Sequence, residues 1–183
     1  MNFNTSEYSY NTSNEHWRKS ISFLLMGLML NLFRIPLLFL DIILPIIGFV
    51  FMFLGANQLR RLNSEFQNVY YLIVIQIVVL ILGSLIKSSG FMSLLFWWIK
   101  AGLQLVIIYN IKNAVALAYR SVGREPSRDP FLALIVWVVV TTILNSMFLL
   151  QVLLFIPLII AFVYLVFDFN KFRLETMELD VLV

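Results

Sequence analysis

Long apolar runs separated by short polar segments dominate the chain from Ile21 onward. The run from Ile21 to Leu59 would measure roughly 58 Å as one straight helix, about twice the ~30 Å hydrocarbon thickness of a bilayer. Pro36 and Pro45 lie near its middle, and proline disfavours helix at the residue before it. We therefore expect two helices here, over residues 19–38 and 42–60.

The second half of the chain repeats this pattern. The run from Phe131 to Phe167 would reach roughly 55 Å if straight, so it also needs a turn, which the polar residues near Ser146 indicate. Two further apolar runs lie between the hairpins, separated by the turn-forming cluster at residues 87–90. The predicted helices of this part cover residues 69–86, 91–110, 131–148 and 151–168.

The fourth run leaves one alternative open. Its helical pattern continues through Ile111 to Tyr119, which predicts an extension beyond the apolar segment. If Lys100 instead marks a boundary, Phe91–Ile99 becomes a re-entrant or interfacial segment and the topology after it changes.

Composition places these helices in a membrane. Hydrophobic residues make up 61% of the 183 residues and charged residues 13%, whereas soluble domains are near 45–50% apolar and about 25% charged. We expect an all-α, polytopic integral membrane bundle of six transmembrane helices over residues 19–170. Residues 1–18 then form a polar, disordered tail and residues 171–183 a cytoplasmic tail.

The distribution of basic residues predicts the orientation. With both termini inside, ten of the 13 lysines and arginines lie on the inner side, which is what the positive-inside rule predicts. They are Arg18, Lys19, Arg60, Arg61, Lys112, Arg120, Arg124, Arg128, Lys171 and Arg173. Because these residues flank apolar spans, the net charge of +3 favours a bilayer with anionic headgroups as partner, and not nucleic acid.

Lys100 is the residue that most suggests an intramembrane site. An ammonium near mid-membrane costs about 2.5–3.5 kcal/mol, so it should not face lipid. Helical spacing places it on one face with other polar residues of its run, and two more helices offer groups to the same interior. The candidates for this polar site are Gln76, Ser93, Lys100, Gln104, Thr141, Thr142 and Asn145. The alternative is hydrogen bonding between helices, with a lysine that extends toward the headgroups.

Other polar residues suggest structural roles. Arg34 and Asp41 could form an ion pair across the outer turn of the first hairpin, as a clasp or as a gate. Arg120, Arg124 and Arg128 predict an exposed basic loop on the cytoplasmic side that a soluble partner could contact. Asp168 and Glu175, near the inner end of the last helix, are expected to be solvated.

The tryptophans and glycines suggest two further features of the bundle. Tryptophans 97, 98 and 137 fit an aromatic belt at the membrane interface. The glycines at positions 27, 48, 55, 83 and 102 could allow close helix contacts, although no apolar span contains a strict Gly-x-x-x-Gly motif.

The sequence lacks the residues that several kinds of enzyme and metal site require. Cysteine is absent, and His16 is the one histidine, so neither a thiolate nucleophile nor a His-based or Cys-based metal site is expected. No Gly-x-Ser-x-Gly motif or phosphate-binding glycine loop occurs. We therefore expect a protein that is not an enzyme and that uses no cofactor or metal.

The segment Asp41–Gly55, with Leu44-Pro45 and Ile47-Gly48-Phe49 inside it, resembles small uncharacterised multi-spanning membrane proteins of Gram-positive bacteria. Ile46 stands where those proteins have an acidic residue. The resemblance covers roughly 30 residues and implies a location in the bacterial plasma membrane.

Two functions remain open from the sequence. One is a non-enzymatic accessory, regulatory or immunity-type membrane component, which acts with a membrane-protein partner or as a homo-oligomer. The other is a small transporter or channel with a polar site around Lys100 and Gln104.

Overall fold

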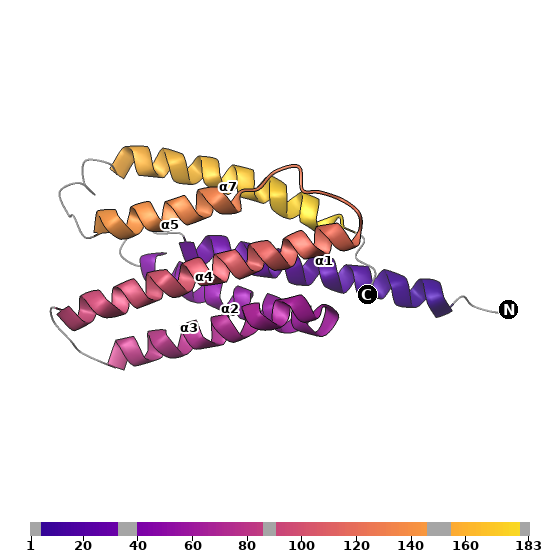
Figure 1. Cartoon of the computed structure of the whole chain (residues 1–183), viewed down its shortest axis with the longest axis horizontal. Helices are drawn as coiled ribbons and strands as arrows, with labels where there is room; N and C mark the ends of the chain where they lie inside the picture. Colours follow the sequence, from indigo (N-terminus) through magenta and orange to yellow (C-terminus); the bar gives the residue numbers. More distant parts are fainter. Residues whose placement is uncertain (1–4, 33–39, 86–90, 146–154, 180–183) are drawn as a thin grey trace.

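A computed structural model describes residues 5–32, 40–85, 91–145 and 155–179, with side chains for residues 14–32, 43–83, 95–144 and 156–179. This part of the chain consists of six α-helices and one short 3-10 helix, without strands (Figure 1). In chain order they are α1 (Thr5–Leu32), α2 (Leu40–Leu62), η1 (Ser64–Phe66), α3 (Gln67–Leu85), α4 (Phe91–Ser121), α5 (Phe131–Asn145) and α7 (Phe155–Met177).

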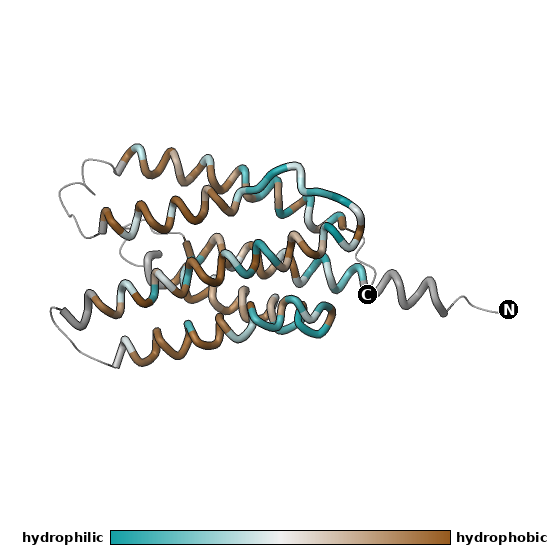
Figure 2. Tube along the Cα trace, viewed as in Figure 1, coloured by the Kyte–Doolittle hydropathy of each residue, from teal (hydrophilic) through white to brown (hydrophobic). Residues whose placement is uncertain are grey.

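The helices run side by side and alternate in direction. The start of α1, the α2–α3 connection, the α4–α5 loop and the end of α7 all lie at one end of the bundle (Figure 1). Hydrophilic residues gather at this end, whereas the middle of every helix is mainly hydrophobic (Figure 2). We call this the polar end.

Three helices in the described part of the chain are long and apolar enough to cross a membrane. They are Ile43–Leu62 and Ser64–Gly83, each of 20 residues, and Leu95–Ser121, of 27 residues, and a shorter apolar helix covers Phe131–Leu144. Among the described residues, α1 and α7 carry charged side chains toward the polar end, such as Arg18 in α1 and Lys171 in α7.

Glycines hold α1 and α2 together. A Cβ on Gly27 would lie 2.5 Å from the backbone N of Met52, and one on Gly55 would lie 2.5 Å from the backbone N of Leu24. A Cβ on Gly48 would approach the backbone oxygen of Gly27 to 2.7 Å. Gly48 and Gly55 are seven residues apart and share a face of α2, as in a coiled-coil seam. The expectation of close contacts is thus confirmed at three glycines, and not at Gly102, where a Cβ would meet nothing within 4 Å.

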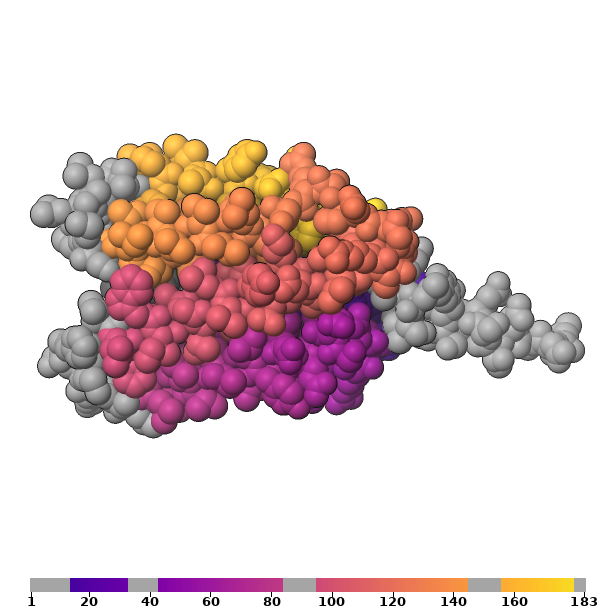
Figure 3. Space-filling view, viewed as in Figure 1, coloured from indigo at the N-terminus to yellow at the C-terminus, as the bar shows by residue number. Residues whose placement is uncertain are grey.

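Helix α1 supplies the centre of the core. Ile21, Leu24, Leu25 and Leu28 are fully buried, and α1 packs against both α2 and α7. Trp17 is also fully buried, and its Nε1–H donates to the backbone oxygen of Thr176 in α7 over 3.3 Å. On the face seen in Figure 3, side chains of α4 fill the space between α3 and α5.

Two helices are longer than the sequence pattern predicts. Helix α1 begins at Thr5, so residues 5–18 are helical where a disordered tail was expected. Helix α7 continues to Met177, and Phe172 and Thr176, in the expected C-terminal tail, are buried. For α7 and for the part of α1 near Trp17 the physical reason is packing, since Trp17, Phe172 and Thr176 are buried and Trp17 donates to the backbone oxygen of Thr176.

Helix α4 is one continuous helix from Phe91 to Ser121, which agrees with the predicted extension beyond Asn110. It ends in a Schellman motif, in which Gly123 N donates to Arg120 O and Arg124 N to Tyr119 O, both over 3.0 Å. Gly123 has the positive φ of 66° that this motif requires.

Candidate functional site

The two C-terminal helices leave a groove between them. In the described part of the chain, α5 packs mainly against α4 and α7 mainly against α1, and the two helices make few close backbone contacts with each other. Aromatic rings bridge them instead, with Trp137 and Phe162 at 5.2 Å and Phe131 and Phe172 at 5.4 Å between ring centroids. Both pairs lie toward the inside of the bundle, since all four rings are buried.

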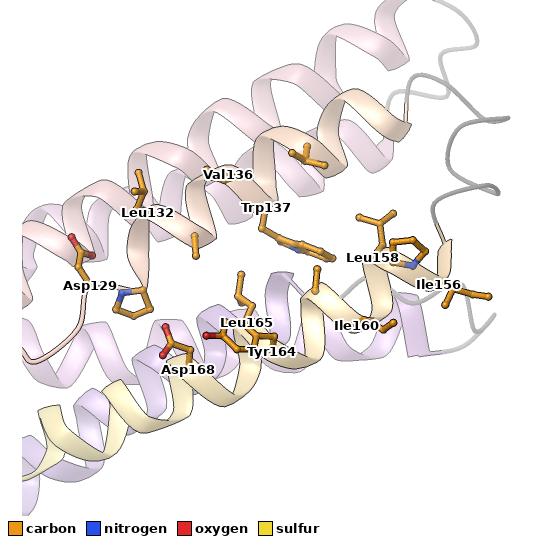
Figure 4. Close-up of a pocket in the computed structure, with 15 residues that line it drawn as sticks. Asp129, Leu132, Val136, Trp137, Ile156, Leu158, Ile160, Tyr164, Leu165 and Asp168 are labelled. Carbon is orange, nitrogen blue, oxygen red and sulfur yellow. The ribbon is translucent and has the colours of Figure 1, made fainter.

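The outer side of this contact is an open, largely apolar groove of about 980 Å³ (Figure 4). Aliphatic side chains of both helices form its walls, and Trp137 reaches across it from α5 (Figure 4). The small side chains of Ala133 and Ala161 leave room between the helices. Its lining also includes Leu132, Tyr164, Asp129 and Asp168.

One end of the groove is charged, and we call it the charged mouth: Lys112, Arg128, Asp129 and Asp168. Lys112 Nζ lies 2.5 Å from Asp129 Oδ2, and Arg128 Nη1 donates to Asp168 Oδ1 over 2.7 Å. Both carboxylates line the groove, whereas the two cations that pair with them do not. The groove therefore meets acceptor oxygens at its polar end.

The hydrogen bond with Asp168 raises the pKa of Arg128 further above its usual value. A raised pKa stabilises the folded state at every pH below it, and this contribution is lost only in strong alkali. Arg128 therefore carries its charge throughout the neutral range.

The α4–α5 loop is fixed by its own contacts. Asp129 Oδ1 accepts from the backbone N of Phe131 over 3.1 Å at the start of α5. Ser127 donates to Glu175 of α7 from its backbone N over 2.8 Å and also from its hydroxyl. These contacts hold Arg128 and Asp129 at the groove.

A second polar contact lies inside the bundle. Gln104 Nε2 of α4 donates to Asn31 Oδ1 of α1 over 2.9 Å, and both residues are buried. Asn31 Nδ2 and Gln76 Nε2 are buried without a hydrogen-bond partner among the described residues. Amides thus join α1 to α4 across an apolar interior.

The predicted polar site is only partly assembled. Of its members, Gln104 is joined to Asn31, and Thr141 donates to backbone oxygens of its own helix, at Trp137 and Val138. Gln76 and Thr142 are buried and Lys100 is partly exposed. Neither the groove nor a smaller cavity of about 300 Å³ between α1 and α7 includes any of these residues.

The side chains of four predicted residues lie outside what the structure describes. The side chains of Ser93 and Asn145 are among them, and so is the expected ion pair of Arg34 with Asp41.

The basic loop differs in detail from the prediction. Arg120, Arg124 and Arg128 are exposed, as expected, but Arg128 is paired with Asp168. The expectation that Asp168 and Glu175 are simply solvated is wrong, because Arg128 and Ser127 bind them. No sequence signal indicated these pairs, since 40 residues separate Arg128 from Asp168 and 48 separate Ser127 from Glu175.

Trp137 is a second correction. It was expected in an interfacial belt, but it is 9% exposed and packs on Phe162 at the base of the groove. Its helix turns this face toward α7, which hydropathy alone could not indicate.

No known protein family, curated protein or solved structure matches this chain. The groove between α5 and α7, with its charged mouth, is the candidate site that the described residues form.

Proposed function

We propose that the chain is a six-span membrane bundle of the bacterial plasma membrane, with both termini in the cytoplasm, and that it acts as a non-enzymatic accessory component. The resemblance of the Asp41–Gly55 segment supports the bacterial membrane. The polar end would face the cytoplasm.

The observation that carries this proposal is the exposure of large apolar side chains on the outside of the bundle. Ile75, Val78 and Ile81 form such a face on α3, and Ile156, Ile160 and Phe167 on α7. Soluble proteins rarely expose contiguous apolar surfaces of this extent. Hydrocarbon would cover these faces without cost, and an accessory partner could dock against them.

The basic residues support the orientation. Five of the ten lysines and arginines expected inside lie at the polar end by their place in the chain: Arg60 and Arg61 in the last turn of α2, Arg120 in the last turn of α4, and Arg124 and Arg128 in the α4–α5 loop. Hydrophilic residues gather at this end (Figure 2). A cytoplasmic leaflet with anionic headgroups attracts basic residues in such positions.

A non-enzymatic role fits the chemistry of the groove. Its two carboxylates are held by Lys112 and Arg128, so they are poorly placed to act as a general acid and base. The accessory role is therefore one of binding.

Single-cysteine labelling tests the topology, because the chain has no cysteine of its own. In intact cells, a membrane-impermeant maleimide should label Ser89→Cys and Ser146→Cys, in the predicted outer turns. Glu65→Cys and Glu125→Cys should react only after lysis. Labelling of Glu125→Cys in intact cells, or equal labelling of all four, contradicts the proposal.

The alternative function, a transporter or channel around Lys100 and Gln104, remains a prediction. The unpaired donors of Asn31 and Gln76 favour it, because buried polar groups normally find partners. It requires a water-accessible path, so a single cysteine at position 104 should react with a small maleimide in the folded protein. If this cysteine does not react in the folded protein, no water-accessible path reaches position 104.

A further inference from the structure

The groove between α5 and α7 calls for an apolar occupant. Its walls are aliphatic over most of their length, and Leu132 and Ile160, both 65% exposed, mark its rim. If the bundle lies in a membrane as proposed above, an open groove cannot stay empty, since unfilled space forfeits the contacts of its lining. An acyl chain is the occupant that a bilayer supplies at this position.

The charged mouth determines which lipid headgroup fits at the polar end of the groove. The polar groups that line the groove are the carboxylates of Asp129 and Asp168 and the hydroxyl-bearing ring of Tyr164, and no basic residue lines it. A headgroup placed there meets acceptors first, which favours an ammonium that donates hydrogen bonds to carboxylates.

The two cations that pair with these carboxylates add positive charge at the mouth. Arg128 and Lys112 each lie within 3 Å of a carboxylate oxygen, so positive and negative charges alternate at the mouth. A zwitterionic headgroup with an ammonium and a phosphate complements this pattern. A singly anionic headgroup such as phosphatidylglycerol offers the carboxylates neutral hydroxyl donors and no ammonium, so it complements this pattern less well.

We propose that the groove binds a phospholipid with a primary amine, as in phosphatidylethanolamine. One acyl chain lies between α5 and α7, the ammonium contacts Asp168 and Asp129, and the phosphate lies beside Arg128. This inference rests on the proposed membrane location and names the partner of the groove. It makes the selection of one lipid class a property of the charged mouth.

Lipid titration of the purified protein by native mass spectrometry tests the headgroup. Phosphatidylethanolamine should bind about tenfold more tightly than phosphatidylglycerol of the same acyl chains, the effect expected of a charge-assisted hydrogen bond. Asp168→Asn should remove this preference. Glu178→Gln is the matched control, because Glu178 is an exposed carboxylate of the polar end that does not line the groove, and it should keep the preference.

A second pair of variants tests the position of the acyl chain. Ala161→Trp fills the groove and should reduce binding of phosphatidylethanolamine about tenfold. Val163 lies two residues away on α7 and lines neither of the two cavities. The Val163→Trp variant should therefore bind phosphatidylethanolamine like the parent protein. Thermal unfolding without lipid shows whether each variant is folded, and Asp168→Glu, which keeps the charge, should retain the preference if Asp168→Asn does not fold.

Three results would overturn the inference: equal binding of the two lipids by the parent protein, a preference that survives Asp168→Asn in a folded protein, or binding unaffected by Ala161→Trp. Disulfide crosslinking between two copies carrying Leu132→Cys would also overturn it, since a second copy would then occupy the groove. A chain that inserts with the proposed topology but lacks the lipid preference contradicts this inference alone. A chain that does not insert contradicts both proposals.

Discussion

Single glycines determine how closely the first two helices pack. At Gly27, Gly48 and Gly55 the neighbouring backbone lies where a Cβ would stand, whereas Gly102 on α4 faces open space. The same residue type thus has opposite consequences at different positions, and the structure separates them.

This contrast gives a matched pair of substitutions. Gly55→Ala should destabilise the protein by about 1–3 kcal/mol, because its Cβ would force α1 away from α2. Gly102→Ala should leave stability unchanged or raise it by about 0.5–1 kcal/mol, since alanine loses less conformational entropy within a helix. Thermal unfolding of both variants in the same detergent measures the difference. Equal effects would mean that α1 and α2 are not in close contact.

At the scale of elements, the α4–α5 loop depends on contacts between distant parts of the chain. Gly123 ends α4, Asp129 caps the start of α5, and Ser127 and Arg128 bind α7. The loop is thereby attached to both walls of the groove.

Trypsin reports on this attachment, because Arg124 and Arg128 are cleavage sites in the loop. Asp168→Asn removes the partner of Arg128, and exposed ion pairs contribute about 0–1 kcal/mol, so cleavage should become about two- to fivefold faster. High salt should accelerate cleavage of the parent protein in the same direction, because it screens the pair. Glu178→Gln, an exposed carboxylate change elsewhere at the polar end, should have no effect. Unchanged cleavage in Asp168→Asn would show that the ion pair does not hold the loop.

The elements themselves could be predicted from the sequence more readily than their contacts. Each described α-helix overlaps one of the predicted apolar segments, because chain length and hydrophobicity leave few other arrangements. The helical start of α1 could not be predicted in this way, since residues 5–16 show no apolar stripe. The groove and its ion pairs could not either, because they depend on the angle at which α5 and α7 separate.

At the scale of the whole molecule, α1 is the element that the other helices enclose. It contacts α2 and α7 and reaches α4 through Asn31 and Gln104. Trp17 anchors its polar end between η1 and α7, with Phe66 at 5.9 Å between ring centroids and Thr176 as hydrogen-bond acceptor.

Substitution of this tryptophan should therefore affect the whole bundle. Trp17→Ala should cost about 3–5 kcal/mol, since it removes a fully buried ring. Trp98→Ala is the matched control, because Trp98 is 47% exposed, and it should cost much less. Denaturant or thermal unfolding followed by circular dichroism compares the two. Similar losses in both variants would contradict the central position of α1.

The contact between Trp17 and Thr176 also has a consequence for biosynthesis. These residues are 159 positions apart, so the ribosome makes Trp17 long before it makes Thr176. Until α7 is made, the face of α1 that α7 covers has no cover from its own chain. The bundle is therefore completed only after α7 has been made, and a chain truncated before α7 would present this uncovered face to the proteases that remove unfinished membrane proteins.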